Sequence, residues 1–129
     1  MTIELTYLTY VVLLTALLWF PYVLNGVSVR GLVAAVSYPP AQKPLAAWAE
    51  RLKAAHYNAV ENLVVFAALV LVANAAGVSN AATATACEVY FWARLVHPIG
   101  YTFAIPWVRT VAFMIGVVCQ LSLAVQILG

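Results

Sequence analysis

The sequence predicts an all-α integral membrane protein built as one four-transmembrane-helix bundle. Its 129 residues are 66% hydrophobic and only 8% charged, and the mean hydropathy is +0.99, far outside the soluble globular range. Four apolar segments approach the roughly 20 residues that cross about 30 Å of hydrocarbon. Because lipid offers no partner to a free backbone N–H or C=O group, we expect each segment to be helical. Residues 1–129 are therefore expected to form a single domain.

The four expected spans follow one another along the whole chain. The first begins beside an acidic residue, Glu4, and not beside the basic residues of a signal peptide, so we expect it to remain as a helix. The spans are Leu5 to Leu24, Asn58 to Ala76, Ala81 to Phe103 and Trp107 to Leu128.

Glycine and proline mark the expected breaks between these helices. The stretch "NGVSVRG" is expected to end the first helix, and Pro44 suits the first position of a long second helix, where its missing N–H costs nothing. In "NAAGVSN", Gly77 is the expected C-cap of the second helix, and Ser79 or Asn80 is the expected N-cap of the third. Pro106 is expected to open the fourth helix.

The basic residues indicate an orientation in the membrane. All six lie in or beside two connections on the same side of the bundle, between helices 1 and 2 and between helices 3 and 4. By the positive-inside rule these basic loops face the cytoplasm, and both termini lie on the non-cytoplasmic side. The six are Arg30, Lys43, Arg51, Lys53, Arg94 and Arg109.

Composition also bears on partners. A net charge of +2 on so apolar a chain gives no reason to expect nucleic acid, whereas membrane lipids are expected neighbours.

Cys87 and Cys119 fall inside expected spans without a CxxC pattern, so the first interpretation is two buried apolar side chains, with a disulfide or a metal ligand as alternatives. No metal site is expected.

Polar side chains gather on one flank of the second helix. At about 100° per residue, five positions fall within an arc of about 100°, and His56 points the opposite way. The five are Arg51, Ala54, Asn58, Glu61 and Asn62.

The third helix carries a stripe with i, i+4, i+7, i+11 spacing, formed by Tyr90, Arg94, His97 and Tyr101. A charge at mid-bilayer costs at least about 2.5–3.5 kcal/mol, so the charged residues of the spans should face protein or water and be paired. One interpretation is a packing pair of Glu61 with Arg94, with asparagines as interhelical hydrogen-bond donors and acceptors. The other is a pocket that holds a small anionic ligand.

Glu88 lies too far along the third helix to reach this pocket. We expect it to be hydrogen-bonded between subunits or to be neutral, with Gln120 as a candidate partner.

Two motifs carry a family resemblance. "ERLKAAHYNAVENLVVF" resembles the second-helix signature of the MAPEG family, the membrane-associated proteins in eicosanoid and glutathione metabolism, and "ARLVHPIGYTFAIPWVRTVAF" resembles the signature of its third and fourth helices. The resemblance implies a homotrimer. It further implies that glutathione lies near the cytoplasmic face, between helices 1 and 2 of one subunit and helices 3 and 4 of its neighbour.

The resemblance also implies residue roles. Arg109 would stabilise the glutathione thiolate during conjugation or reduction of a lipophilic electrophile, in the manner of a nucleophile activated by a cation. His97 is either a structural hydrogen-bonding group or a ligand contact. The implied glutathione contacts are Arg30, Arg51, Asn58, Glu61, Arg94, His97 and Tyr101.

Three positions depart from the prostaglandin E synthase branch of the family. Ala54 and Tyr57 replace arginines, and Phe113 replaces a tyrosine. These departures weigh against prostaglandin isomerase activity. They leave a glutathione transferase or peroxidase as the first hypothesis, and a non-catalytic scaffold that binds lipid or a partner membrane protein as the alternative.

Overall fold

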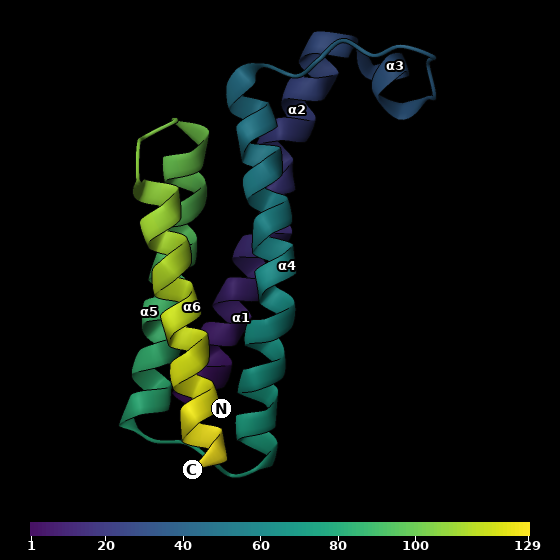
Figure 1. Ribbon diagram of the computed structural model, residues 1–129. Helices are drawn as coiled ribbons and strands as arrows, with labels where there is room; N and C mark the ends of the chain where they lie inside the picture. The colour runs from purple at the N-terminus through teal and green to yellow at the C-terminus, as the bar shows by residue number, and fades with distance from the viewer.

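The structure, a computed structural model, describes all 129 residues and is entirely helical between its turns (Figure 1). Helices α1 and α2 follow each other end to end as one rod, and α4, α5 and α6 run alongside it. The all-α prediction is confirmed. The helices are α1 (Ile3–Leu17), α2 (Trp19–Arg30), α3 (Leu32–Val36), α4 (Ala47–Ala75), α5 (Ala81–Thr102) and α6 (Val108–Leu128).

Three helical segments are long and apolar enough to cross a membrane: Ile3–Arg30, Ala47–Ala75 and Val108–Leu128. Helix α5 is not among them, because Glu88, Arg94 and His97 interrupt its apolar run. A chain with three such segments is a multi-pass integral membrane protein.

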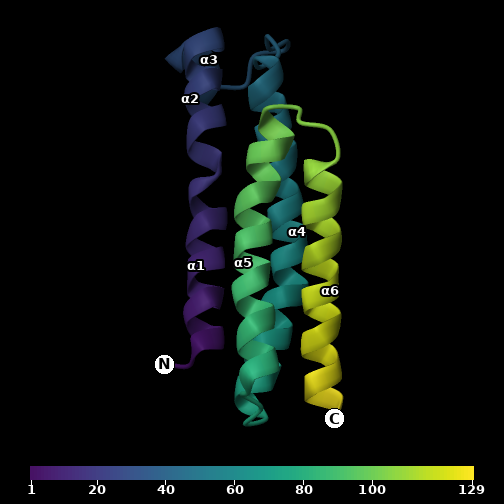
Figure 2. The ribbon, with the colours of Figure 1, turned by 90° about the vertical axis from the view of Figure 1, so that its left-hand side faces the viewer.

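The two ends of the bundle differ in charge. The termini and the α4–α5 turn lie at one end, and the α2–α4 connection and the α5–α6 turn lie at the other, here called the loop end (Figures 1 and 2). The basic connections are thus at the same end, as expected from the sequence. Which side of a membrane the loop end faces stays a prediction.

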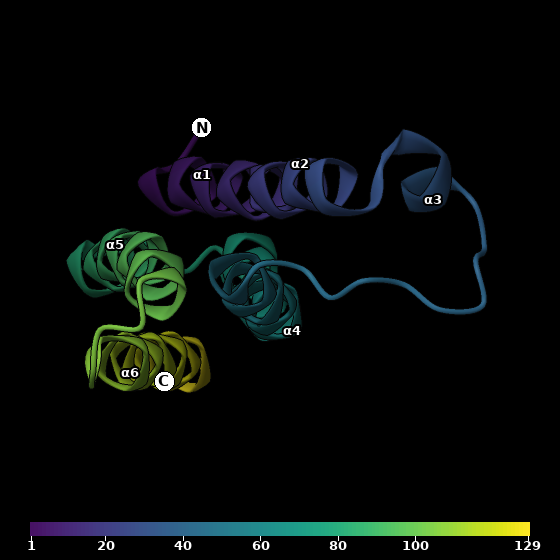
Figure 3. The same ribbon diagram turned by 90° about the horizontal axis from the view of Figure 1, so that it is seen from above.

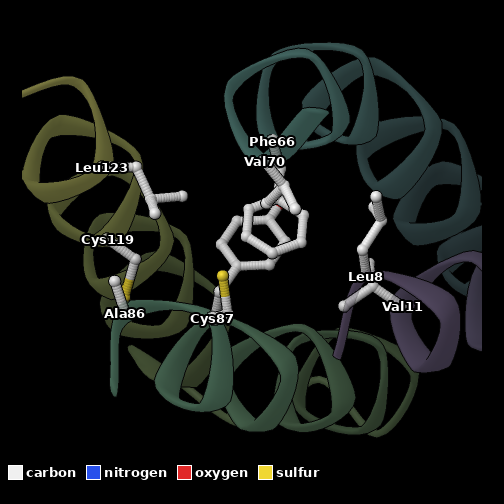
Figure 4. Close-up of a cluster of buried hydrophobic side chains, with 9 residues drawn as sticks. Leu8, Val11, Phe66, Val70, Ala86, Cys87, Cys119 and Leu123 are labelled. Carbon is white, nitrogen blue, oxygen red and sulfur yellow. The ribbon is translucent and has the colours of Figure 1, made fainter. Parts of the chain in front are cut away.

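A core of nine buried apolar side chains joins all the long helices (Figure 4). Seen from above, α6 and the α1–α2 rod lie on opposite sides of α5 (Figure 3), so α5 is packed on several faces. At its centre the rings of Phe66 on α4 and Tyr90 on α5 stack with centroids 3.8 Å apart. Cys87 and Cys119 are buried members of this core and are free thiols, as first interpreted.

The first rod departs from the expected helix in two ways. It is interrupted after Leu17, because Pro21 has no N–H to donate to the Leu17 carbonyl four residues earlier. It also extends past Leu24, the end of the expected span, and stops at Gly31, the last residue of the stretch that was expected to end it, whose φ is +82°. Gly26 instead allows close packing, since a Cβ there would lie 3.3 Å from Leu45.

Helix α4 begins at Ala47, three residues later than the expected start at Pro44. The preceding backbone is held by two side chains instead: the N–H of Leu45 donates to Glu50 Oε1 at 3.2 Å, and the N–H of Ala46 donates to Asn25 Oδ1 at 3.0 Å. The bond to Asn25 ties the start of α4 to α2, and the bond to Glu50 closes the first turn of α4.

In the turns after α4 and after α5, one residue just past the end of the helix takes the left-handed backbone conformation. Gly77, with φ +72°, follows the C-cap Ala76, and Asn80 caps α5 by accepting from the N–H of Thr83 at 3.0 Å. After α5, Ala104 takes the left-handed position at φ +55°.

The fourth helix also begins later than expected. Helix α6 starts at Val108 after a left-handed Trp107 (φ +71°), so Pro106 lies in the turn and does not open the helix.

Candidate functional site

A cavity of about 320 Å³ opens at the loop end between α5, the α5–α6 turn and α6. Two guanidinium side chains line it, and no carboxylate does. We call it the arginine cavity. It is lined by Arg51, Gly100, Tyr101, Ala104, Ile105, Pro106, Trp107, Arg109 and Thr110.

A second cavity of about 310 Å³ shares three of these residues. We call it the histidine cavity. It likewise contains no acidic side chain. It is lined by Asn58, His97, Tyr101, Arg109, Thr110 and Phe113.

Arg51 is fixed in place by the end of a neighbouring helix. Its Nε donates to the carbonyl of Thr102 at 2.9 Å. The last carbonyls of an α-helix have no partner within the helix and carry the negative end of its dipole, so a guanidinium is favoured there. Arg51 therefore caps the C-terminus of α5 and lines the arginine cavity.

Arg109 lies in the first turn of α6 and is exposed to the cavity. Its guanidinium carbon is 4.5 Å from the centroid of the Tyr101 ring, in a cation–π contact. The ring holds the guanidinium from one side without neutralising its charge. That charge stays available to an anionic group.

Behind the two cavities lies a buried cation. Arg94 is only 3% exposed, and its side-chain partner is a neutral amide, since Nη2 donates to Asn58 Oδ1 at 3.0 Å. The packing pair of Glu61 with Arg94 is therefore wrong. Asn58 lies nearer the middle of the polar flank and faces α5, whereas Glu61 lies at its edge and is exposed.

Four buried polar side-chain atoms have no hydrogen-bond partner. They are Nε of Arg94, Nδ1 of His97, Oγ1 of Thr102 and the hydroxyl of Tyr90. Buried polar groups are normally hydrogen-bonded. His97 is 2% exposed and lines the histidine cavity, so a polar ligand there could supply a partner for its ring.

The structure brings most, but not all, of the expected residues together. Arg51, Tyr101 and Arg109 meet in one cavity of a single chain, with Asn58 and His97 in the next. Three expected residues line neither cavity: Glu61 is exposed on α4, Arg94 is buried, and Nε of Arg30 donates to the Lys43 carbonyl at 2.7 Å.

The cavity wall formed by the α5–α6 turn was not predicted from the sequence. Gly100 carried a usable signal, because a glycine two residues before a helix end permits close packing: a Cβ there would lie 2.2 Å from Val108 Cγ1.

The expected pairing of Glu88, the other charged residue of α5, with Gln120 is wrong within the chain, and a hydrogen bond of Glu88 between subunits stays a prediction. Glu88 is exposed on the outer face of the chain, and Gln120 is not its partner, because Nε2 of Gln120 donates to the Asn62 carbonyl at 3.3 Å. The two side chains lie on different faces of their helices.

An apolar groove of about 490 Å³ adjoins the arginine cavity. It runs between α5 and α6, and all nine residues that line it are hydrophobic. Trp107 lines both the groove and the arginine cavity. A ligand could therefore touch charged and apolar surface together.

The comparison with family models decides the classification. The model of the MAPEG family matches residues 7–129, nearly the whole chain. The chain belongs to the MAPEG family. No curated protein and no solved structure matches it.

Membership places this MAPEG protein among the membrane proteins of glutathione and eicosanoid metabolism at the level of the family. Five residues of the two quoted motifs, Arg51, Asn58, His97, Tyr101 and Arg109, line the two cavities at the loop end.

Proposed function

We propose that this MAPEG protein binds glutathione at the loop end and conjugates or reduces lipophilic electrophiles. The proposal rests mainly on the arginine cavity, where Arg51 and Arg109 face a space that contains no acidic side chain. Glutathione has two carboxylates, and arginine is the side chain best suited to bind them.

The proposed chemistry begins with the thiol of glutathione. With a pKa near 8.5, a cysteine thiol is mostly protonated at neutral pH, and a neighbouring cation lowers that value. Arg109 supplies the cation. In conjugation the thiol releases its proton to solvent, the thiolate forms a carbon–sulfur bond with the electrophile, and the leaving group departs with its electron pair.

The remaining groups of the tripeptide have matching partners. The amide of Asn58 and the ring of His97 line the histidine cavity and would hydrogen-bond the peptide backbone. Glu61 suits the glutathione ammonium. Because Glu61 and Arg30 line neither cavity of the single chain, their role requires a neighbouring copy.

That requirement favours the homotrimer implied by the family motifs. We propose that α5 also crosses the membrane, so that each subunit contributes four spans. Its charged stripe faces the interior of the bundle, where Arg94 and His97 are buried, and this is how spanning helices accommodate such residues. The loop end then faces the cytoplasm and the termini lie on the other side.

The apolar groove favours the proposal that the substrate reaches the site from the bilayer. Its walls on α5 and α6 are entirely hydrophobic, and it meets the arginine cavity at Trp107. An apolar electrophile could approach the thiolate along it without crossing water.

A second candidate function is a scaffold that binds lipid or a partner membrane protein and catalyses nothing. Ala54, Tyr57 and Phe113 favour it, since each lacks a polar group that the prostaglandin E synthase branch has.

Turnover of glutathione with a soluble aromatic electrophile distinguishes the two functions. Arg109→Ala should abolish the thiolate absorbance and the turnover, Arg109→Lys should retain part of both, and Lys43→Ala, outside the cavities, should leave both unchanged. Equal turnover in Arg109→Ala and the parent protein would refute the mechanism. An absence of turnover in the parent would favour the scaffold.

A further inference from the structure

The connection between α2 and α4 carries a patch of apolar side chains that the bundle does not bury. Leu32, Val33 and Val36 of α3 are 64%, 79% and 73% exposed, and Tyr38 is fully exposed at 100%. Helix α3 packs only against α2 and contacts no other helix. We call these four residues the α3 patch.

The position of the α3 patch limits what can cover it. Helix α3 projects sideways from the bundle, on the side away from α5 and α6 (Figure 3). It also turns back from the top of α2 toward the level of the α5–α6 turn (Figure 1). In a membrane-spanning bundle that level is the boundary between the apolar spans and water, where tyrosine and tryptophan side chains are enriched.

The connection is held in shape at its base. Nε of Arg30, at the end of α2, donates to the Lys43 carbonyl at 2.7 Å, closing the segment into a loop. Gly31 turns the chain between α2 and α3 with a φ of +82°. The apolar residues are therefore carried by a loop with a closed base.

The charge of the segment is of one sign. Arg30 and Lys43 flank the α3 patch, and no acidic residue occurs between Glu4 and Glu50. Basic residues beside a spanning helix are attracted to anionic lipid headgroups, each contributing a favourable term near the surface. Apolar side chains beside basic ones are typical of segments that lie in the headgroup region.

We infer that the α3 patch inserts into the headgroup region of the leaflet at the loop end, with Lys43 facing anionic headgroups. The α2–α4 connection is thus a membrane-surface anchor. This inference does not depend on the proposed glutathione chemistry.

Site-specific fluorescence on the whole protein in nanodiscs tests it. Val33→Cys and, as a matched control in the same loop, the exposed Gln42→Cys are each labelled with an environment-sensitive fluorophore. The native Cys87 and Cys119 are buried, and the parent protein measures their background labelling. The nanodiscs contain phosphatidylcholine alone or mixed with phosphatidylglycerol.

We expect the label at residue 33 to emit at shorter wavelength than the label at residue 42 and to be quenched by nitroxide lipids more than by aqueous iodide. Phosphatidylglycerol should increase that difference, and Lys43→Gln should remove much of the increase. Iodide quenching of residue 33 equal to that of residue 42 would overturn the inference. Protection of the label at residue 33 from both quenchers would overturn the inference and indicate that protein covers the α3 patch. A difference between the two labels that phosphatidylglycerol leaves unchanged would overturn the role of anionic lipid.

Discussion

Arg94 on α5 donates from Nη2 to Oδ1 of Asn58 on α4 at 3.0 Å, and this bond gives a buried guanidinium its side-chain partner. Because Arg94 is 3% exposed and has no carboxylate beside it, loss of the amide would leave a buried charge without that partner. The bond thus couples the wall of the histidine cavity to the packing of α4 against α5.

Replacing Asn58 with alanine should destabilise the protein by about 1–3 kcal/mol, the usual cost of an unsatisfied buried polar group. Asn62→Ala is the matched control, since its side-chain amide bonds only within α4. Unfolding in mixed detergent micelles measures both. An equal loss in the two variants would contradict the role given to the Arg94 bond.

Gly100→Ala should force α5 and α6 apart at the arginine cavity, because the new Cβ would lie 2.2 Å from Val108 Cγ1. Overpacking of this kind costs about 1–3 kcal/mol. The second substitution Val108→Ala should restore most of the stability, whereas Gly116→Ala, whose nearest neighbour would be 3.4 Å away, should be tolerated. Thermal unfolding of the three variants checks this, and a failure of Val108→Ala to rescue would argue against the clash.

Glu4 should be a structural residue at the terminal end of the bundle. Its carboxylate is 5% exposed and accepts hydrogen bonds from the hydroxyls of Ser79 and Thr83, which joins α1 to the start of α5. Glu4→Leu should cost about 1–3 kcal/mol by leaving donors unpaired.

Glu4→Gln, which keeps an acceptor, should cost less than Glu4→Leu. Glu88→Leu, on an exposed site of α5, should change stability by no more than about 0.5 kcal/mol. If the Glu4 and Glu88 variants unfold alike, the proposed link is wrong.

Tyr101 should act through its ring. The cation–π contact with Arg109 is worth about 0.5–1 kcal/mol at an exposed site, or roughly two- to fivefold in affinity. Tyr101→Leu should weaken glutathione binding by that factor, and Tyr101→Phe should retain most of it. Titration calorimetry measures both, and an equal loss in the two variants would assign the effect to the hydroxyl.

The sequence was sufficient to predict the helical class because the apolar segments are long and the breaks are marked. Of the two expected N-caps of the third helix, Ser79 and Asn80, the structure confirms Asn80. The starts of α4 and α6 were misplaced because proline only permits a helix to begin. Distant contacts set the start of α4, such as the bond from the Ala46 N–H to Asn25.

The candidate site was predictable only in part for a similar reason. Helical spacing placed Arg51 and Asn58 on one flank of α4, and Arg94 and Tyr101 on one stripe of α5, but it could not say which residues pair across the two helices. The partner of Arg94 is an amide because the packing of α4 against α5 sets Asn58 opposite it. Side-chain register between helices is a tertiary property.

Thermal unfolding of the detergent-purified protein with glutathione, and with an analogue that lacks the thiol, tests the central claim most directly. A ligand that binds only the folded protein stabilises it by about 2.7 kcal/mol at a hundredfold excess over Kd. We predict that both compounds raise the Tm of the parent protein and of Lys43→Ala, and that Arg51→Ala loses the shift. No shift of the parent at saturating glutathione, or an undiminished shift in Arg51→Ala, would contradict a glutathione site in the arginine cavity.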